Sequence, residues 1–349
     1  MIAVKTGENF MKKGNPTSEF EVVFIHSLFR SGSTYFYHAL KRTGQAHVYH
    51  EPFHEVIGNL PSAWKDLAGR IGDFKKTYRH DFLKGSYFDE YAHLLPTIKK
   101  TFDASISFEL FFLDSQYDSP VLKTYIDSLI SGSPLCPVLQ CTRSIGRVEW
   151  LKSNYASKHI FLLRNPWDQW YSYKVDNHIS ASPQLIYSQP RLPKVLEKIM
   201  EACEFTPLRG SDISSQLHYC SSHPVTPEAD YFLFFGLWLY AFFVAKAECD
   251  LVIDMDCISR EQSGREEAEK FLLEIGLKGI DLNDCKLHQS LYKQDELDFY
   301  KHIEGQGSFS TTQPIQLIVD EAGHVIKIEG SMSMAGTYTK FAKFKNMHE

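Results

Sequence analysis

The segment 29–34, FRSGST, combines residue types that can hold a phosphate-like anion. Gly32 permits a positive φ and lets a ligand approach the backbone closely. Arg30 adds a permanent positive charge that can donate two parallel hydrogen bonds. Further donors are the hydroxyl groups of Ser31, Ser33 and Thr34. If a helix begins here, its unpaired N–H groups and its dipole add to the attraction. The segment predicts an anion-binding turn, with an ordinary strand-to-helix turn as the alternative.

The turn departs from the P-loop of enzymes that bind nucleoside triphosphates. That loop has the pattern G-x-x-x-x-G-K-[ST]. Here Ser27 stands where the first glycine is required, and Ser33 stands where the lysine is required. The cation precedes the glycine instead, at Arg30. This departure disfavours an ATP-dependent phosphotransferase using Mg²⁺, which remains the alternative enzyme class.

A second segment of this kind occurs farther along the chain, at residues 162–166 (LLRNP). Arg164 leaves the end of an expected strand, and Ser172 follows it by eight residues, about two turns into an expected helix. Both side chains could therefore reach one anion beside the sheet. The alternative is a capped helix start with an incidental arginine and a surface serine.

Together, and in this order, the two segments resemble the signature segments of sulfotransferases that use 3′-phosphoadenosine-5′-phosphosulfate (PAPS). In that family a [RK]-S-G-[ST]-T turn binds the 5′-phosphosulfate, and an R-N-P segment with a later serine binds the 3′-phosphate. The resemblance covers roughly residues 20–175 and 230–260. It implies PAPS as co-substrate and PAP as product, without a metal. The implied 5′ site is Arg30, Ser31, Gly32, Ser33 and Thr34, the implied 3′ site is Arg164 and Ser172, and Tyr35 is implied to lie near the adenine.

Transfer to a hydroxyl group requires a general base that takes the proton of the acceptor. Glu51, followed by Pro52, resembles the acidic position of carbohydrate and related sulfotransferases, where a Glu after the first helix is the base. The cytosolic arylalkyl type instead has a K-T-H segment, and the corresponding residues 139–143 (LQCTR) contain neither Lys nor His. The resemblance is thus closer to the carbohydrate type and implies Glu51 as catalytic base.

Other residues near Glu51 keep alternatives open. His50 and His54 are alternative bases, because a neutral imidazole can also accept a proton. The structural alternative for Glu51 is a loop carboxylate paired with an arginine. Arg30 is the catalytic residue expected to stabilise charge on the bridging oxygen. Arg143 either touches the sulfate or the acceptor, or is a solvated residue at a helix start.

The elements that position these residues follow from the pattern of apolar residues. A strand is expected at Glu21–Phe29 and a helix at Thr34–Thr43, ended by Gly44. A strand at Lys158–Leu163 and a helix that begins after Asn165 repeat this order. Alternating strands and helices predict an α/β fold, a P-loop-like parallel sheet with helices on both faces.

The remaining expected elements are a strand at Pro137–Cys141, a helix at Ile145–Ala156, a buried helix at Tyr231–Ala245, and a strand at Asp250–Met255. The apolar run of the helix at Tyr231–Ala245 is too short for a membrane span. Near the end of the chain, Ile315–Asp320 and His324–Glu329 predict a small β-hairpin with its turn at residues 321–323.

The domain organisation expected for the 349 residues is one sulfotransferase domain at 21–349 after a polar N-terminal arm at 1–20. Two long segments, 55–135 and 178–230, interrupt the alternation and are expected to be helical insertions that form a substrate cap. They contain no motif that names the acceptor. The Glu51-Pro52 pattern favours a sugar or a small alcohol.

The composition of the chain limits the classes of partner and cofactor that it is expected to bind. The net charge of −6 disfavours a dedicated nucleic-acid partner. Seven cysteines without a C-x-x-C pair disfavour a zinc knuckle. The first twenty residues lack the apolar core of a signal peptide, so a cytoplasmic protein with no membrane span is expected. The non-enzymatic alternative is an inactive relative that binds PAP or another nucleotide, and no pattern indicates the oligomeric state.

Overall fold

A computed structural model describes residues 20–60, 88–174, 177–288, 291–306, 315–319 and 325–330. Of the expected N-terminal arm, only Phe20 lies within these residues.

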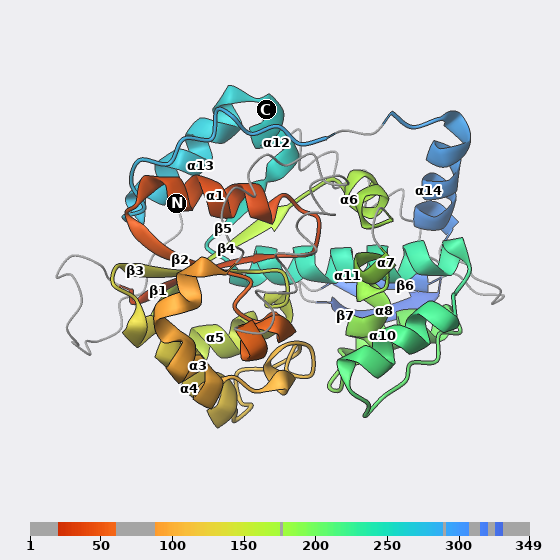
Figure 1. The fold of residues 1–349 in the computed structure, drawn as a ribbon. Coiled ribbons are helices and arrows are strands. Elements are labelled where there is room, and N and C mark those ends of the chain that lie inside the picture. Colours follow the sequence, from red (N-terminus) through yellow and green to blue (C-terminus); the bar gives the residue numbers. More distant parts are fainter. Residues whose placement is uncertain are drawn as a thin grey trace.

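The main sheet has five strands, all parallel, in the order β2-β3-β1-β4-β5 (Figure 1). The strands are β1 (Val22–Ser27), β2 (Ala46–His50), β3 (Cys136–Cys141), β4 (Ser157–Leu163) and β5 (Leu251–Asp254). The expected α/β class is therefore confirmed. Because β1 lies in the centre and is covered on both faces, all six of its residues are buried.

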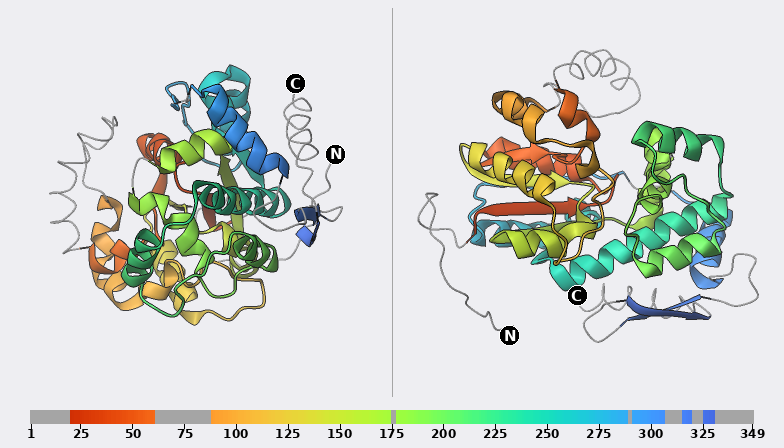
Figure 2. Two further views of the ribbon diagram at one scale, coloured as in Figure 1. Left: turned by 90° about the vertical axis from the view of Figure 1, so that its right-hand side faces the viewer. Right: turned by 90° about the horizontal axis from the view of Figure 1, so that it is seen from below.

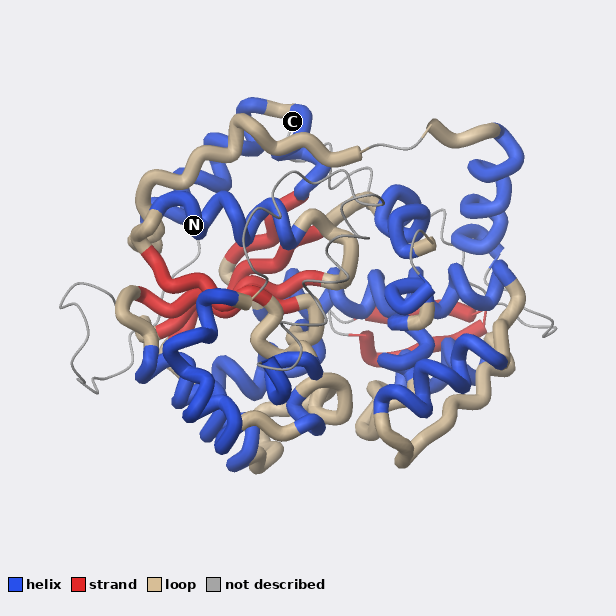
Figure 3. The backbone as a smooth tube through the Cα atoms, in the orientation of Figure 1, coloured by secondary structure: helices blue, strands red, loops and turns tan. Residues whose placement is uncertain are grey.

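Helices cover both faces of this sheet (Figures 1 and 3). One face carries α1 (Ser33–Thr43), α12 (Met255–Arg260) and α13 (Gln262–Glu274). The other carries α3 (Leu95–Thr101), α4 (Pro120–Gly132) and α5 (Val148–Asn154). Successive side chains of a strand point to opposite faces. Accordingly, Val23 and Ile25 pack with α1, whereas Val22 and Phe24 pack with α4 and α5.

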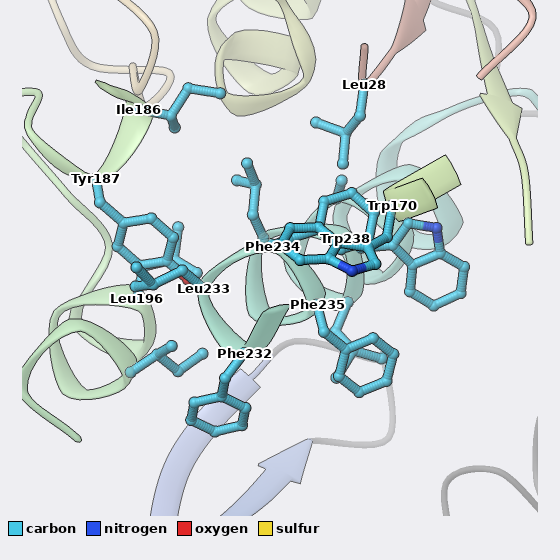
Figure 4. Packing of buried hydrophobic residues seen from close by; sticks show 14 of the residues in the cluster. Leu28, Trp170, Ile186, Tyr187, Leu196, Phe232, Leu233, Phe234, Phe235 and Trp238 are labelled. Carbon is cyan, nitrogen blue, oxygen red and sulfur yellow. The ribbon is translucent and has the colours of Figure 1, made fainter. Parts of the chain in front are cut away.

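A long helix, α11 (Pro227–Glu248), joins the sheet to a second, helical half of the molecule (Figure 2). The other helices of this half are α6 (Pro166–Tyr173), α7 (Asn177–Ser180), α8 (Ser182–Tyr187), α9 (Lys194–Ala202), α10 (Ile213–Ser222) and α14 (Gln294–Gln306). Figure 4 shows aromatic and aliphatic side chains packed around α11, among them Phe234, Trp238 and Trp170.

The expected burial of this helix is confirmed, but its expected length is wrong. Thr226 caps its N-terminus and Pro227 occupies the first turn, so the helix has 22 residues. Within the described part of the chain it is the helix that is long and apolar enough to cross a membrane. However, 72% of its apolar window is buried inside the protein.

The helix expected at Ile145–Ala156 is divided into a 3-10 turn, η4 (Ile145–Arg147), and α5. The carbonyl oxygen of Gly146 accepts a hydrogen bond of 3.1 Å from the backbone N–H of Leu113. It is thus engaged by a residue outside the helix. A Cβ atom at Gly146 would lie only 2.7 Å from the Phe111 carbonyl oxygen, so this close contact requires glycine.

The described parts of both long insertions are mainly helical. The first contains η1 (Glu55–Asn59), η2 (Asp89–Leu94), α3, η3 (Ala104–Ile106) and α4. The second contains most of α7, all of α8, α9 and α10, and the start of α11. Near the chain end, β6 (Ile315–Val319) and β7 (Val325–Gly330) pair antiparallel in a separate two-stranded sheet. The turn expected between them lies outside the described residues, so the hairpin stays a prediction.

Candidate functional site

The turn between β1 and α1 has the backbone conformation that its glycine predicts. Gly32 is the N-cap of α1, with φ 91°. A Cβ atom at this position would lie 3.0 Å from Met255 Cε and 3.1 Å from a Leu287 methyl group. Both the positive φ and the close packing therefore favour glycine. The N–H groups of the first turn of α1 have no acceptor within the helix and add a positive end to the dipole.

The two anion-binding segments meet at Arg30. Its Nε donates a hydrogen bond of 2.8 Å to Ser172 Oγ. Its carbonyl oxygen accepts one of 2.8 Å from Nη1 of Arg164. β1 and β4 are neighbours, with Ser27 opposite Leu162, so their carboxyl ends bring the two segments together. Arg30, Arg164 and Ser172 thus form one cluster.

Two buried donor groups in this cluster have no hydrogen-bond partner among the described residues. They are the hydroxyl group of Ser31, whose residue is fully buried, and the Nε of Arg164, whose residue is 7% exposed. A buried donor without a partner is costly and uncommon in native proteins. An anion at the turn would satisfy such donors. Ser33 is buried beside them, and Thr34 is half-buried.

Burial also affects the charge of Arg164. Desolvation lowers the pKa of its guanidinium, and the nearby carboxylate of Asp256 opposes this effect. The two Nη groups of Arg164 donate to main-chain carbonyl oxygens, those of Arg30 and His288. Neutral acceptors therefore hold this guanidinium in a buried position.

A segment after α13 crosses the turn, and no sequence pattern indicated it. The His288 carbonyl oxygen accepts a bond of 2.6 Å from Arg164, and the Leu287 side chain lies over Gly32. Asp284 accepts a bond of 2.6 Å from the Tyr35 hydroxyl group and pairs with Arg42 at 2.9 Å. Burial, followed by the bond to Asp284, raises the pKa of Tyr35. The adenine contact expected of Tyr35 stays a prediction.

Glu51 lies directly after β2 on the same carboxyl edge. Its φ of 47° is unusual for a residue with a side chain, above all before a proline. Its Oε2 accepts bonds from Thr142 Oγ1 at 2.8 Å and from Nη1 of Arg143 at 3.0 Å. The N–H of Thr142 lies 3.2 Å from both oxygens, and Oε1 also accepts from Gln140 Nε2 at 3.4 Å. Glu51 is thus a buried carboxylate paired with an arginine, and its catalytic role stays a prediction.

The two alternative bases have different surroundings. His50 is buried, its Nδ1 lies 2.6 Å from Gln140 Oε1, and desolvation lowers its pKa, so the imidazole is neutral at pH 7. His54 is half-buried and caps η1, its Nδ1 accepting from the N–H of Val56 at 3.1 Å. Hydrogen bonds connect Glu51 and His50 through Gln140. The backbone N–H of His54 donates a bond of 2.9 Å to the carbonyl oxygen of Glu51.

Arg143 is not the solvated residue that one alternative expected, since it is only 2% exposed. Its guanidinium carbon lies 4.7 Å from the ring centre of Phe29 and 5.0 Å from that of Phe108. The ion pairs with Glu51 and Glu55 and the two nearby rings explain why this charged side chain is buried. It connects the anion-binding turn, the end of β2 and the first insertion.

Within the described ranges, no group of three or more His, Cys, Asp or Glu side chains could hold a metal ion. Comparisons of the chain with protein-family models, with curated proteins and with solved structures found no match.

Proposed function

We propose that the protein is a PAPS-dependent sulfotransferase, closer to the carbohydrate type than to the cytosolic arylalkyl type. The observation that carries this proposal is the convergence of Arg30, Arg164 and Ser172, from two segments far apart in sequence, at neighbouring strand ends. The unpartnered donors of Ser31 and Arg164 fit the anionic groups of such a co-substrate. The finer fold assignment, a P-loop-like core with both insertions forming a substrate cap, belongs to this proposal.

The reaction joins a hydroxyl acceptor and PAPS to give a sulfate ester, PAP and a proton. The acceptor oxygen forms a bond to sulfur while the bond from sulfur to the 5′-phosphate oxygen breaks. Glu51 takes the acceptor proton as general base. Arg30 and the N–H groups at the start of α1 stabilise the negative charge that develops on the leaving oxygen. Holding both reactants in line supplies a further part of the rate enhancement.

Two sets of anion-binding groups, supplied by two segments of the chain that meet at Arg30, favour PAPS over ATP. PAPS carries anionic groups at both the 5′ and the 3′ position, whereas ATP has no 3′-phosphate. In this proposal the turn with Ser31, Gly32, Ser33 and Thr34 binds the 5′ end, and Arg164 with Ser172 binds the 3′ end. The proposed acceptor is a sugar or small alcohol, and the proposed setting is the cytoplasm, without a nucleic-acid partner.

Arg164→Ala tests the assignment of the two ends. Calorimetry should show that the variant loses far more affinity for PAP than for adenosine 5′-phosphate, which lacks the 3′ group. The loss of a charge-assisted hydrogen bond costs about 1.5–3 kcal/mol, or roughly 10- to 150-fold in affinity. Arg191→Ala is the matched control, because Arg191 also donates to main-chain carbonyl oxygens but lies in the second insertion. Equal losses for both nucleotides would overturn the 3′ assignment.

A release assay separates the proposed enzyme from its two alternatives. The wild-type protein should release PAP from PAPS when incubated with a panel of sugars and aliphatic alcohols. Tight PAP binding without release by any acceptor would favour the inactive relative. Binding of ATP that requires Mg²⁺ and exceeds that of PAP would favour the phosphotransferase.

A further inference from the structure

Arg143 contacts both acidic and aromatic side chains at the carboxyl ends of the strands. Arg143 is the second residue after the end of β3, and its guanidinium lies over the rings of Phe29 and Phe108. Phe29 directly precedes Arg30 in the anion-binding turn. The edge of the guanidinium pairs with Glu51 at 3.0 Å and with Glu55 at 3.4 Å. One side chain thereby fixes the distance between the turn and the carboxylate proposed as the base.

The two oxygens of the Glu51 carboxylate are held unequally. Oε2 receives the two shortest bonds, from Thr142 Oγ1 at 2.8 Å and from Arg143 at 3.0 Å. Oε1 receives a bond of 3.4 Å from Gln140 and shares the N–H of Thr142, which lies 3.2 Å from both oxygens. An oxygen has two lone pairs, so Oε2 is saturated by these short bonds while the acceptor capacity of Oε1 is less committed.

The contacts of Glu51 hold its backbone in a conformation that a residue with a side chain rarely adopts. A φ of 47° in a residue before proline costs free energy and persists only where the surroundings enforce it. The ion pair with Arg143 and the bonds from Thr142 supply that enforcement. Strain of this kind is typical of residues whose orientation matters for function.

We propose that Arg143 is a positioning residue, which holds Glu51 by Oε2 and leaves Oε1 to take the proton of the acceptor. The proposal rests on the proposed function for the role of the proton transfer. The coupling between the two side chains, by contrast, is a property of the protein alone. The two can therefore be tested separately.

The experiment measures the ionisation of Glu51 directly. Protein labelled with ¹³C at the glutamate side-chain carboxyl carbon is titrated by NMR, and Glu51→Gln assigns the Glu51 signal. Arg143→Met keeps an apolar side chain beside the two rings but removes the charge. Because an adjacent positive charge favours the carboxylate, the Glu51 signal of this variant should titrate about one to two pH units higher than in the wild type. Arg143→Lys, which restores the charge, should recover at least half of that shift.

Arg147→Met is the matched control. Arg147 is also fully buried and stacks on a phenyl ring, at 4.7 Å from the centre of Phe53. Its guanidinium, however, donates to the carbonyl oxygens of Ile106 and Ser107. This variant should lower the unfolding temperature and leave the Glu51 titration in place. An unmoved signal in folded Arg143→Met, or an equal shift in folded Arg147→Met, would overturn the proposal.

If Arg143→Met does not fold, Thr142→Val provides the test. It removes the 2.8 Å bond to the same oxygen without changing a charge. The Glu51 signal should then move upward by about half a pH unit to one unit, because a hydrogen bond to the charged form is lost. Here too, an unmoved signal would overturn the positioning role.

Turnover separates this proposal from the proposed function. With PAPS and an acceptor found in the release assay, Arg143→Met should lower kcat at least tenfold, leave the KM for PAPS within a factor of three, and move the acid limb of the pH–rate profile as far as the NMR titration. A shifted titration in a protein that neither binds PAP nor releases it sinks the proposed function but not the coupling of Arg143 to Glu51. Normal PAP release with an unmoved titration sinks the positioning role alone.

Discussion

At the scale of single residues, the two proposed catalytic side chains share an unusual backbone conformation. Arg30 has φ 63° and Glu51 has φ 47°, both in the left-handed region that residues with a Cβ atom rarely adopt. Such residues cost of order 1–3 kcal/mol each and are found preferentially at functional sites. The two residues follow β1 and β2 at the same edge of the sheet, with the end of β3 between them. Phe88, Arg191 and Glu204 also have a positive φ, but of the described residues of this kind only Arg30 and Glu51 belong to the proposed reaction site.

Glu51→Gln tests the proposed base, because it keeps the shape of the side chain and removes its basicity. PAP affinity should change little, whereas turnover should fall by roughly 10²–10⁴, the usual contribution of general base catalysis. The acid limb of the pH–rate profile should disappear. Glu55→Gln is the matched control, since Glu55 pairs with the same arginine, and it should retain the acid limb. Normal turnover of Glu51→Gln combined with an inactive His50→Ala or His54→Ala would identify a histidine as the base.

At the scale of elements, α14 is attached to the helical half by a buried acid. Glu304 accepts hydrogen bonds of 2.5 Å from Trp167 Nε1 of α6 and from the Tyr231 hydroxyl group of α11. Tyr300 stacks on Trp167, with ring centres 5.4 Å apart. Both donors to Glu304 are neutral, so desolvation dominates and raises the pKa of its carboxyl group to about 7. Sequence patterns gave no sign of this contact, because helix–helix pairing depends on residues far apart in the chain.

Glu304→Gln should make the attachment of α14 insensitive to pH. The raised pKa means that the folded state holds its proton more tightly than the unfolded state, so this group destabilises the fold increasingly as the pH rises from 4.5 to about 7. The full cost above pH 7 is roughly 3 kcal/mol. Chemical denaturation measures the free energy of unfolding of both proteins. The value of the variant minus that of the wild type should be larger at pH 8 than at pH 5. A difference between variant and wild type that is the same at both pH values would contradict the pKa assigned here.

At the scale of the whole molecule, a chain of polar side chains runs along one face of the central sheet, from β4 to β1. His159 Nε2 lies 2.8 Å from Ser157 Oγ, its Nδ1 lies 2.9 Å from His26 Nε2, and His26 Nδ1 lies 2.7 Å from Ser144 Oγ. Both imidazoles are almost completely buried. Desolvation lowers the pKa of His159 to about 4 and that of His26 well below its usual value. Both rings are therefore neutral at pH 7, and β1 and β4 are joined by side chains as well as by the strand ladder.

Acidification should weaken the fold through this chain. A histidine whose pKa is lowered on folding binds its proton more tightly in the unfolded state, so stability falls as the pH falls from 6.5 towards 4. For His159 the full effect is roughly 3 kcal/mol. His159→Phe keeps a ring that can stack on Phe24 but removes the titrating group. The variant should be less stable at pH 7, and its stability should decline less between pH 6.5 and pH 4.5. An unchanged decline would contradict the assignment to His159.

The sequence by itself determined the local structure around the candidate site. The positive φ of Gly32, the end of α1 at Gly44, and the cap of α6 by Asn165 all occur where the sequence predicts them. Each depends on a backbone preference or a hydrogen bond between residues at most a few positions apart. The α/β class followed in the same way, from the alternation of apolar strands and helices.

The tertiary structure alone decided which of these segments meet. The order β2-β3-β1-β4-β5 brings Arg164 and Ser172 to Arg30 and places Glu51 at the end of β2, with β3 between β2 and β1. The pairing of Arg143 with Glu51, and the passage of Asp284 to His288 over the turn, had no local signal. The physical reason is that burial and charge pairing act between side chains that the chain brings together only when the sheet forms. A guanidinium such as that of Arg143 is solvated or buried according to whether a carboxylate and two aromatic rings surround it.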